Sequence, residues 1–179
     1  MEVNSLGKKL VYRKRDETME AIKTNAWNIE YASNEMRNDF EIGLECVKQK
    51  GYTLLFLSQT LKENDEIVKA AITQDGWALA FADEKYKHKK EYAMIAIQEK
   101  GWALEFVCKN LRKDVEVSYT ATKKDKRAFK YVPDSLKEQY GYDVDEFIRN
   151  IETSLKQYNS EDILNFINTI ESCKVEISN

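Results

Sequence analysis

The fold of this chain is decided by residues 65–86, which read DEIVKAAITQDGWALAFADEKY. From Ile67 onward, the first half places apolar residues at the i, i+1, i+4 and i+5 spacing of one helix face, and its acidic start suits a helix N-terminus. Gly76 interrupts this segment, and Trp77 begins a second apolar segment. The stretch therefore predicts two short helices separated at a glycine.

One spacing repeats this stretch along the chain. Steps of 25 residues join the aromatic residues Trp27, Tyr52, Trp77 and Trp102, and a further step reaches Arg127. Columns of small residues and of aliphatic residues share this period, as they do in arrays of stacked structural units. We expect an all-α solenoid of about five 25-residue two-helix repeats with a C-terminal helical cap.

Three segments follow from where this period holds. Residues 1–15 are too polar to place and are expected to form an N-terminal arm, and residues 16–139 form the helical repeat array. Residues 140–179 lose the period but contain two amphipathic helical patterns, at about 143–157 and from 160 onward. Because the last repeat of a solenoid would otherwise expose an apolar face, this pair is predicted to cap the array within one continuous domain.

Two columns carry specific expectations. The aromatic column is predicted to be buried, because a residue found in every unit solves the packing problem that every unit shares. Stacking of nucleic-acid bases on Trp77 and its equivalents is the alternative. Gly51, Gly76 and Gly101 end the first helix of their units, so a positive φ angle is expected at each of them.

The copies at 39–61, 65–86 and 91–111 resemble the bacterial repeat family catalogued as domain of unknown function 4116. Units of that family have an acidic start, an apolar run ending in Gln-x-Gly, and then Trp-Ala-Leu-x-Phe-Ala. The resemblance covers roughly residues 16–138 and departs in the fifth unit, where residues 126–129 read KRAF in place of Gly-Trp-Ala-Leu. It implies a helical repeat fold and a bacterial or phage-like origin, and it implies no activity.

Composition points to a mixed-charge globular protein without a catalytic signature. A net charge of −3 with 33% charged residues does not fit a strongly basic nucleic-acid binder. Widely spaced Cys46, Cys108 and Cys173, and the lack of an apolar run of about 18 residues, favour a reduced, cytoplasmic protein without a membrane span. His88 lies in a basic turn and Cys46 replaces alanine in its column, so both are expected to be structural. We therefore expect no enzymatic activity, no metal and no cofactor.

A surplus of positive charge in the middle of the chain is the one localised candidate for a binding site. Residues 85–130 carry 13 basic and 6 acidic side chains, whereas residues 143–179 carry 3 and 8. The candidate partner-binding residues are Lys87, Lys89, Lys90, Lys109, Arg112, Lys113, Lys123, Lys124, Lys126, Arg127 and Lys130. The simpler alternative is internal pairing: Arg127 and its neighbours would either face solvent or meet carboxylates of the cap such as Asp143 and Glu146.

One cation per unit forms a further column, which consists of Arg37, Lys62, Lys87, Arg112 and Lys137. Such a column could line a ridge that faces phosphates or an acidic partner. The simpler interpretation is that these cations form local salt bridges, with glutamates four residues later such as Glu41 and Glu66, or are exposed turn charges.

The long exposed surface of a helical solenoid is suited to binding, so we expect a non-enzymatic protein-interaction module. The expected context is a bacterial effector, or a phage- or mobile-element-encoded inhibitor that occludes a host protein, and the expected location is the cytoplasm, including that of a host cell. The alternative is a nucleic-acid-binding protein that uses the basic region 85–130. Another protein is thus the first expected partner and nucleic acid the second, and the oligomeric state is left open.

Overall fold

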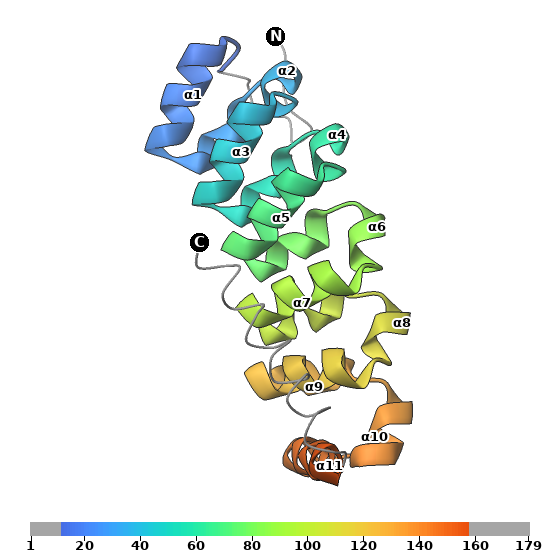
Figure 1. Cartoon of the computed structure of the whole chain (residues 1–179). Helices are drawn as coiled ribbons and strands as arrows, with labels where there is room; N and C mark the ends of the chain where they lie inside the picture. Colours follow the sequence, from blue (N-terminus) through green and yellow to red (C-terminus); the bar gives the residue numbers. More distant parts are fainter. Residues whose placement is uncertain (1–11, 158–179) are drawn as a thin grey trace.

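The computed structural model describes residues 12–157, which form an elongated stack of helices (Figure 1). Each repeat contains a ten-residue α-helix, a six-residue 3-10 helix and a short α-helix, in that order. In the third repeat these are α5 (Asp65–Gln74), η3 (Gly76–Phe81) and α6 (Glu84–Lys87). The all-α solenoid is confirmed, and the second helical segment of each repeat proves to be two helices of different types.

The other repeats keep this order. Their long helices are α1 (Arg15–Thr24), α3 (Phe40–Gln49), α7 (Lys90–Glu99) and α9 (Val115–Lys124). Their 3-10 helices are η1 (Ala26–Tyr31), η2 (Gly51–Phe56), η4 (Gly101–Phe106) and η5 (Lys126–Tyr131). Their short helices are α2 (Asn34–Arg37), α4 (Gln59–Lys62), α8 (Lys109–Arg112) and α10 (Asp134–Tyr140). In Figure 1 the long helices follow one another down the stack, and the short helices follow one another along one edge.

Capping residues divide the second half of the first three repeats. The side chain of Asp75 accepts a hydrogen bond from the backbone N–H two residues later, at 2.9 Å, and so starts η3. Ala82 is extended, and the side chain of Asp83 then accepts a backbone N–H at 3.1 Å to start α6. Ser33 and Ser58 start α2 and α4 through equivalent hydrogen bonds. Each cap begins a new helix, so the segment cannot continue as one.

Two layers of helices enclose one continuous core. Ile72 of α5 and Leu79 of η3 are fully buried, as are their equivalents in the second and fourth repeats. The long helices pack side by side, α3 on α5 and α5 on α7, and the 3-10 helices do the same, η2 on η3 and η3 on η4. The aliphatic columns of the sequence therefore lie in the core, as their period predicted.

The glycine column marks the closest approach between repeats. Among the described glycines only Gly141 has a positive φ angle, so the prediction for Gly51, Gly76 and Gly101 is wrong. A Cβ atom on Gly76 would instead clash with the backbone carbonyl oxygen of Ala96 in the next repeat, and the other two face the equivalent clash. Glycine is needed there because the following long helix presses its backbone against this position.

Backbone hydrogen bonds join the edges of consecutive repeats. In each, the N–H of the residue that precedes a short helix donates to the carbonyl of the last residue in the short helix of the previous repeat. They run from Ser58 N to Arg37 O (3.1 Å), from Asp83 N to Lys62 O (3.1 Å) and from Cys108 N to Lys87 O (3.0 Å). Pro133, at the next equivalent position, has no N–H group and interrupts the series. The free carbonyl of Arg112 accepts a hydrogen bond from the hydroxyl of Ser118 instead, at 2.5 Å.

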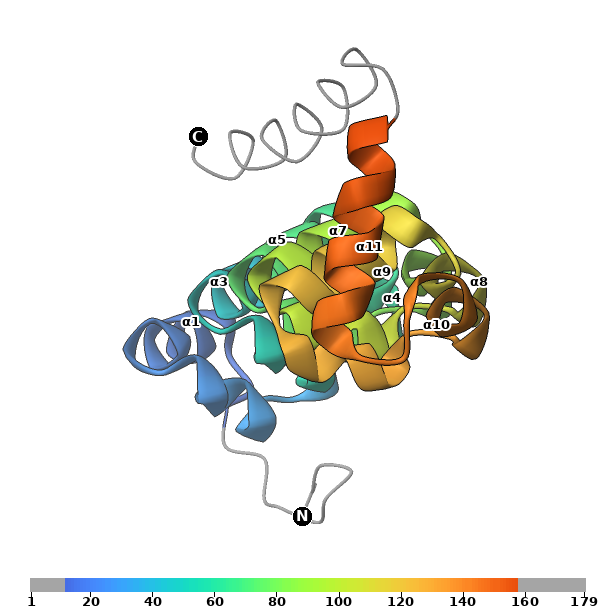
Figure 2. The same ribbon diagram turned by 90° about the horizontal axis from the view of Figure 1, so that it is seen from below.

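An amphipathic helix covers the C-terminal end of the array. α11 (Val144–Gln157) packs on α9 and α10 and lies across the end of the stack (Figure 2). Its Phe147 and Ile151 are buried, and the ring centroid of Phe147 lies 5.3 Å from that of Phe129. α11 occupies the place expected for the first cap helix. The second cap helix, from residue 160, and residues 1–11 of the expected arm lie outside the described residues.

Candidate functional site

The 3-10 helices display an aromatic ladder, formed by Trp27, Tyr52, Trp77 and Trp102, along one face of the stack. Their ring centroids are 5.6 Å apart from Trp27 to Tyr52, 6.1 Å from Tyr52 to Trp77 and 4.6 Å from Trp77 to Trp102. Trp27 is 41% exposed, and the other three are half-buried. The prediction that this column is buried is therefore wrong, because the ladder rings lie outside the core and are partly exposed to solvent.

The period of the 3-10 helix explains this placement. Side chains three residues apart eclipse one another in such a helix, so Gly76 and Leu79 share the buried side of η3 while Trp77 and Ala80 share its outer side. With the α-helical period expected from the sequence, Trp77 and Phe81 would have shared one buried face. The residues three positions after each ladder position lie on the same outer side of the 3-10 helices, and they are Glu30, Leu55, Ala80, Glu105 and Lys130.

A second row of rings supports the ladder. Phe56 lies 6.0 Å from Trp27, Phe81 lies 4.7 Å from Tyr52, and Phe106 lies 6.2 Å from Trp77, measured between centroids. Each of the first three ladder rings therefore contacts two rings of the next repeat. A nucleic-acid base inserted between two ladder rings would need them about 7 Å apart, twice the contact distance between carbon atoms. The observed separations argue against base insertion between the ladder rings.

The ladder stops at the fifth repeat, where Arg127 replaces the aromatic ring. The Arg127 side chain is 78% exposed, and its Nε and Nη2 donate hydrogen bonds to Oδ1 and Oδ2 of Asp125 at 3.0 and 2.7 Å. This pairing lowers the pKa of the Asp125 carboxyl. Arg127 thus both faces solvent and meets a carboxylate, which belongs to its own repeat and not to the cap.

A pocket of about 340 Å³ lies where the next ring of the ladder would be. Trp102 and Glu105 of η4 line one side, and Arg127, Lys130 and Tyr131 of η5 line the other. The Nζ atom of Lys130 lies over the Tyr131 ring, 4.5 Å from its centroid. The pocket therefore combines aromatic walls with charged side chains.

Two basic candidates pair with the cap. Nζ of Lys123 lies 2.8 Å from Oε1 of Glu152, and Nζ of Lys126 lies 2.5 Å from Oδ1 of Asp145, both carboxylates being on α11. The Lys123 hydrogen bond lowers the pKa of Glu152. Internal pairing with the acidic cap is therefore present, through carboxylates other than the two expected.

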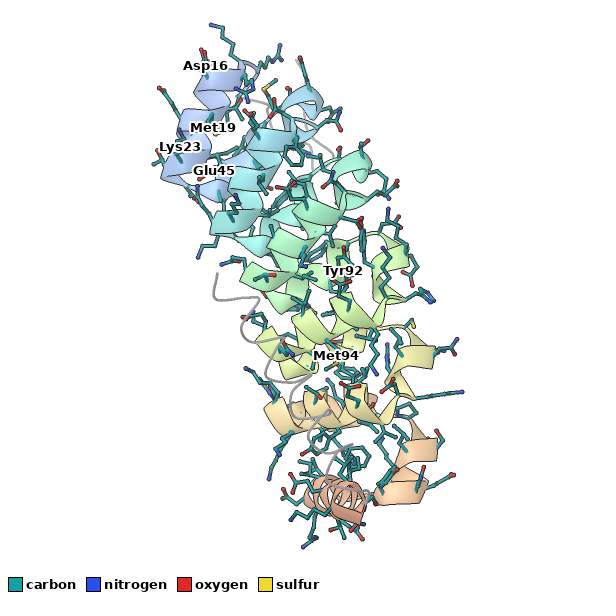
Figure 3. All side chains as sticks on the ribbon, in the orientation of Figure 1. Asp16, Met19, Lys23, Glu45, Tyr92 and Met94 are labelled. Carbon is teal, nitrogen blue, oxygen red and sulfur yellow. The ribbon has the colours of Figure 1, made fainter. Side chains whose placement is uncertain are left out.

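Other basic candidates contact neighbouring repeats. Nζ of Lys90 on α7 lies 2.8 Å from Oδ2 of Asp114 and 2.7 Å from Oε2 of Glu116, both in the next repeat. Nζ of Lys89 lies 3.7 Å from Oδ1 of Asp65 in the preceding repeat, and it also lies over the ring of Tyr92 of α7, 5.3 Å from the centroid (Tyr92 is labelled in Figure 3). These cations join the repeats and are not free to bind phosphates.

The rest of the basic candidates lie along the edge of short helices or near the end of α9. Lys87 pairs with Glu84 at 3.0 Å, and Arg112 donates a hydrogen bond to the carbonyl oxygen of Glu105 at 2.6 Å. Three have no partner among the described residues, namely Lys109, Lys113 and Lys124. The eleven candidates are thus spread from α6 to η5, and most of them make contacts within the described part of the chain.

Two cations of the column, Arg37 and Arg112, point back toward the backbone. Arg37 donates from Nη2 to the carbonyl oxygen of Glu30 at 2.6 Å, as Arg112 does to Glu105. These carbonyls lie near the C-terminal ends of η1 and η4, where a cation complements the helix dipole. Burial, and to a lesser degree the charge of Arg37, lowers the pKa of Lys62. Lys87 and Lys137 do form local salt bridges, with Glu84 at 3.0 Å and Asp134 at 3.6 Å. Local pairing is therefore present in the column, but its described partners stand three residues earlier and not four residues later.

The residues considered for catalysis have structural explanations. Nε2 of the exposed His88 lies 3.5 Å from Oε1 of Glu84, one helical turn earlier. Cys46 is fully buried, and burial raises the pKa of its thiol to about 12. Cys108 is a free thiol at the start of α8, and Cys173 lies outside the described residues. No group of three metal-ligating side chains occurs in residues 12–157.

Stacked repeats of this kind, with one core and one ladder, define an all-α helical-repeat solenoid. The chain belongs to the family described as Domain of unknown function (DUF4116), which matches residues 15–62, 44–87 and 89–137. The first match begins with α1 and ends with α4, so one family unit spans two repeats. No curated protein and no solved structure matches the chain. None of the described helices is both long and apolar enough to cross a bilayer.

Proposed function

We propose that this chain is a non-enzymatic protein-interaction module whose partner binds to the aromatic ladder. The observation that carries the proposal is the continuous row of half-exposed rings on the outer side of η1 to η4. Aromatic residues dominate many protein interfaces because they are large, rigid and amphipathic. The stacked repeats hold these rings in place before binding, so little further ordering is required when a partner docks.

The ladder face also has the charge distribution of an interface. Beside the ladder, Leu55 and Ala80 occupy the middle of the row, and Leu55 is 37% exposed. Glu30 and Lys130 occupy the equivalent positions at its two ends. An apolar centre with a charged rim is the usual arrangement of a protein interface. An effector or inhibitor that occludes a host protein would use a surface of this kind.

Nucleic-acid binding is the weaker alternative. The ion pairs of Lys90, Lys123 and Lys126 reduce the positive charge available to phosphates. The contacts between ladder rings leave no space for inserted bases. A protein partner in the cytoplasm agrees with both observations and with the free thiols of Cys46 and Cys108.

The test compares two exposed apolar side chains on opposite layers. Leu55 of η2 is 37% exposed on the ladder face, and Phe40 of α3 is 38% exposed on the layer of long helices. We expect affinity capture from the encoding organism or its host to recover a partner with the wild-type chain and with Phe40→Glu. Leu55→Glu should fail to recover it, because a buried unpaired carboxylate is costly in an interface.

Stability and nuclease controls complete this test. Thermal unfolding should show that both variants are folded, since each change lies at a partly exposed site. Capture that survives in Leu55→Glu and disappears in Phe40→Glu would move the interface to the long helices. Capture that disappears after nuclease treatment would favour the nucleic-acid alternative.

A further inference from the structure

The last ring of the ladder lacks the neighbour that every other ring has. Trp27 is covered by Tyr52, Tyr52 by Trp77, and Trp77 by Trp102, in each case from the next repeat. In the fifth repeat the residue at this position is Arg127, and no described ring of that repeat lies at stacking distance from Trp102. Within residues 12–157, the side of Trp102 that faces the fifth repeat therefore has no aromatic partner.

The replacement side chain does not fill this position. The side-chain hydrogen bonds from Arg127 to Asp125 turn the guanidinium toward the start of its own helix. The pocket of about 340 Å³ between Trp102 and Tyr131 lies beside it. That volume falls within the range of small-ligand pockets, at about 300 to 1,000 Å³, and is ample for one aromatic side chain.

The charges around the pocket are balanced, which decides the class of ligand. Arg127 is paired with Asp125, and the charge of Glu105 acts on Lys130, whose pKa is raised chiefly by its contact with Tyr131. Among the described residues, the two cations of the pocket, Arg127 and Lys130, are thus matched by Asp125 beside it and by Glu105, which argues against a phosphate or a carboxylate as the ligand. The aromatic walls are the feature that a ligand would exploit, and rings favour offset or tilted contacts with other rings.

We propose that this pocket receives an aromatic side chain of a partner protein, which takes the place of the missing ring beside Trp102 and extends the ladder. This inference rests on the proposed function and gives the partner a chemical identity. Glu105 at the edge of the pocket favours a ring that carries a hydrogen-bond donor, so tryptophan and tyrosine suit the pocket better than phenylalanine. The fifth repeat would then determine which partner segment binds, and the other repeats would supply a common apolar surface.

The experiment uses the full chain and a small probe. N-acetyltryptophanamide is titrated into the nitrogen-15-labelled protein, and the indole N–H signals of Trp27, Trp77 and Trp102 are followed after assignment with single Trp→Phe variants. We expect a saturable shift of the Trp102 signal with a Kd on the order of 1 mM. Trp27, which is more exposed at 41%, is the internal control for non-specific association of rings. N-acetylleucinamide, with no ring, should leave the Trp102 signal unchanged.

A variant that fills the pocket from within makes the test decisive. Arg127→Trp restores the residue found at this position in three other repeats, so it should complete the ladder and abolish the probe-induced shift. Arg127→Ala leaves the pocket open and should keep the shift. Equal shifts at Trp27 and Trp102, or an undiminished shift in Arg127→Trp, would overturn the proposal.

The two proposals can fail separately. If Arg127→Trp captures the partner as well as the wild-type chain does while Leu55→Glu does not, the ladder binds the partner and the pocket plays no part. If Leu55→Glu retains the partner while the probe still binds beside Trp102, the pocket exists and the proposed use of the ladder is wrong.

Discussion

The third and fifth repeats share one backbone and differ on their outer face. Both contain a ten-residue α-helix followed by a six-residue 3-10 helix, and Ala78 and Ala128 are fully buried at the same place in η3 and η5. On the outer side, half-buried Trp77 contrasts with exposed Arg127. The inward positions are constrained by the next repeat, whereas the outward positions are free to change. Differences in binding between repeats should therefore arise from the outward positions.

The largest expected effect on stability is a difference between substitutions on the buried side and on the outer side of η3. Leu79→Ala removes a fully buried side chain and should lower the free energy of unfolding by about 2 to 5 kcal/mol. Trp77→Ala should lower the free energy of unfolding by roughly 2 kcal/mol. Removing a fully buried ring costs about 3 to 5 kcal/mol, and Trp77 is only half-buried. Urea unfolding followed by circular dichroism measures both. A larger loss in Trp77→Ala than in Leu79→Ala would place the ladder in the core.

A smaller difference should distinguish the third repeat from the fifth at the glycine position. Gly76→Ala forces a methyl group against the carbonyl of Ala96 and should destabilise the chain by about 1 to 3 kcal/mol. Lys126 occupies the equivalent place in the fifth repeat, which is followed by the cap helix α11 and not by the long helix of a further repeat. Lys126→Ala loses only an exposed ion pair, so it should cost less than about 1 kcal/mol. Equal losses in the two variants would contradict the close approach as the reason for glycine.

The smallest effect should appear in the pH dependence of the fifth repeat and its cap. The folded-state pKa of Glu152 is depressed below 4.5, chiefly by its hydrogen bond from Lys123. Its contribution is therefore fully present above the unfolded pKa and is lost as the pH falls through the folded value. Because the pair is largely exposed, the loss should stay below about 1 kcal/mol.

Unfolding at pH 6 and at pH 3 measures this loss. The wild-type chain should lose more stability between these two values than Glu152→Gln, in which the titrating group is absent. A Glu→Gln change at Glu138, an exposed residue of α10, serves as the control and should not alter the difference. Identical pH dependence in the wild-type chain and in Glu152→Gln would remove the role of this pair.

The stacking could be predicted because the inward columns of Ile72 and Leu79 stay aliphatic through the first four repeats. The type of the second helix could not, since the apolar pattern of six residues fits an α-helix as well as a 3-10 helix. A signal was present in the capping column of Ser33, Ser58 and Asp83, which marks a new helix start in the first three repeats. The glycine column was recognised, but its cause lies in the next repeat and not in local backbone geometry.

The ladder was found by its spacing and was assigned to the wrong side because of the helix period. The charge pairs between repeats were missed, although their spacing was readable. Lys90 and Asp114 are 24 residues apart, and Lys100 and Asp75 are 25 residues apart, so opposite charges one repeat apart meet in space. Pairing with the acidic cap was expected from the charge of residues 143–179, but its individual pairs could not be predicted, because α11 is not part of the repeat. The pocket beside Trp102 also required the structure, since it depends on where Arg127 points.

Pro133 has a mechanical consequence. A pull along the axis of the solenoid is transmitted from repeat to repeat, partly through the edge hydrogen bonds that end at Arg37, Lys62 and Lys87. The junction between the fourth and fifth repeats lacks this bond, so we expect it to yield first under tension. Since Trp102 lies at the same junction, stretching the chain would widen the pocket, and a bound side chain would act as a clasp that resists the extension.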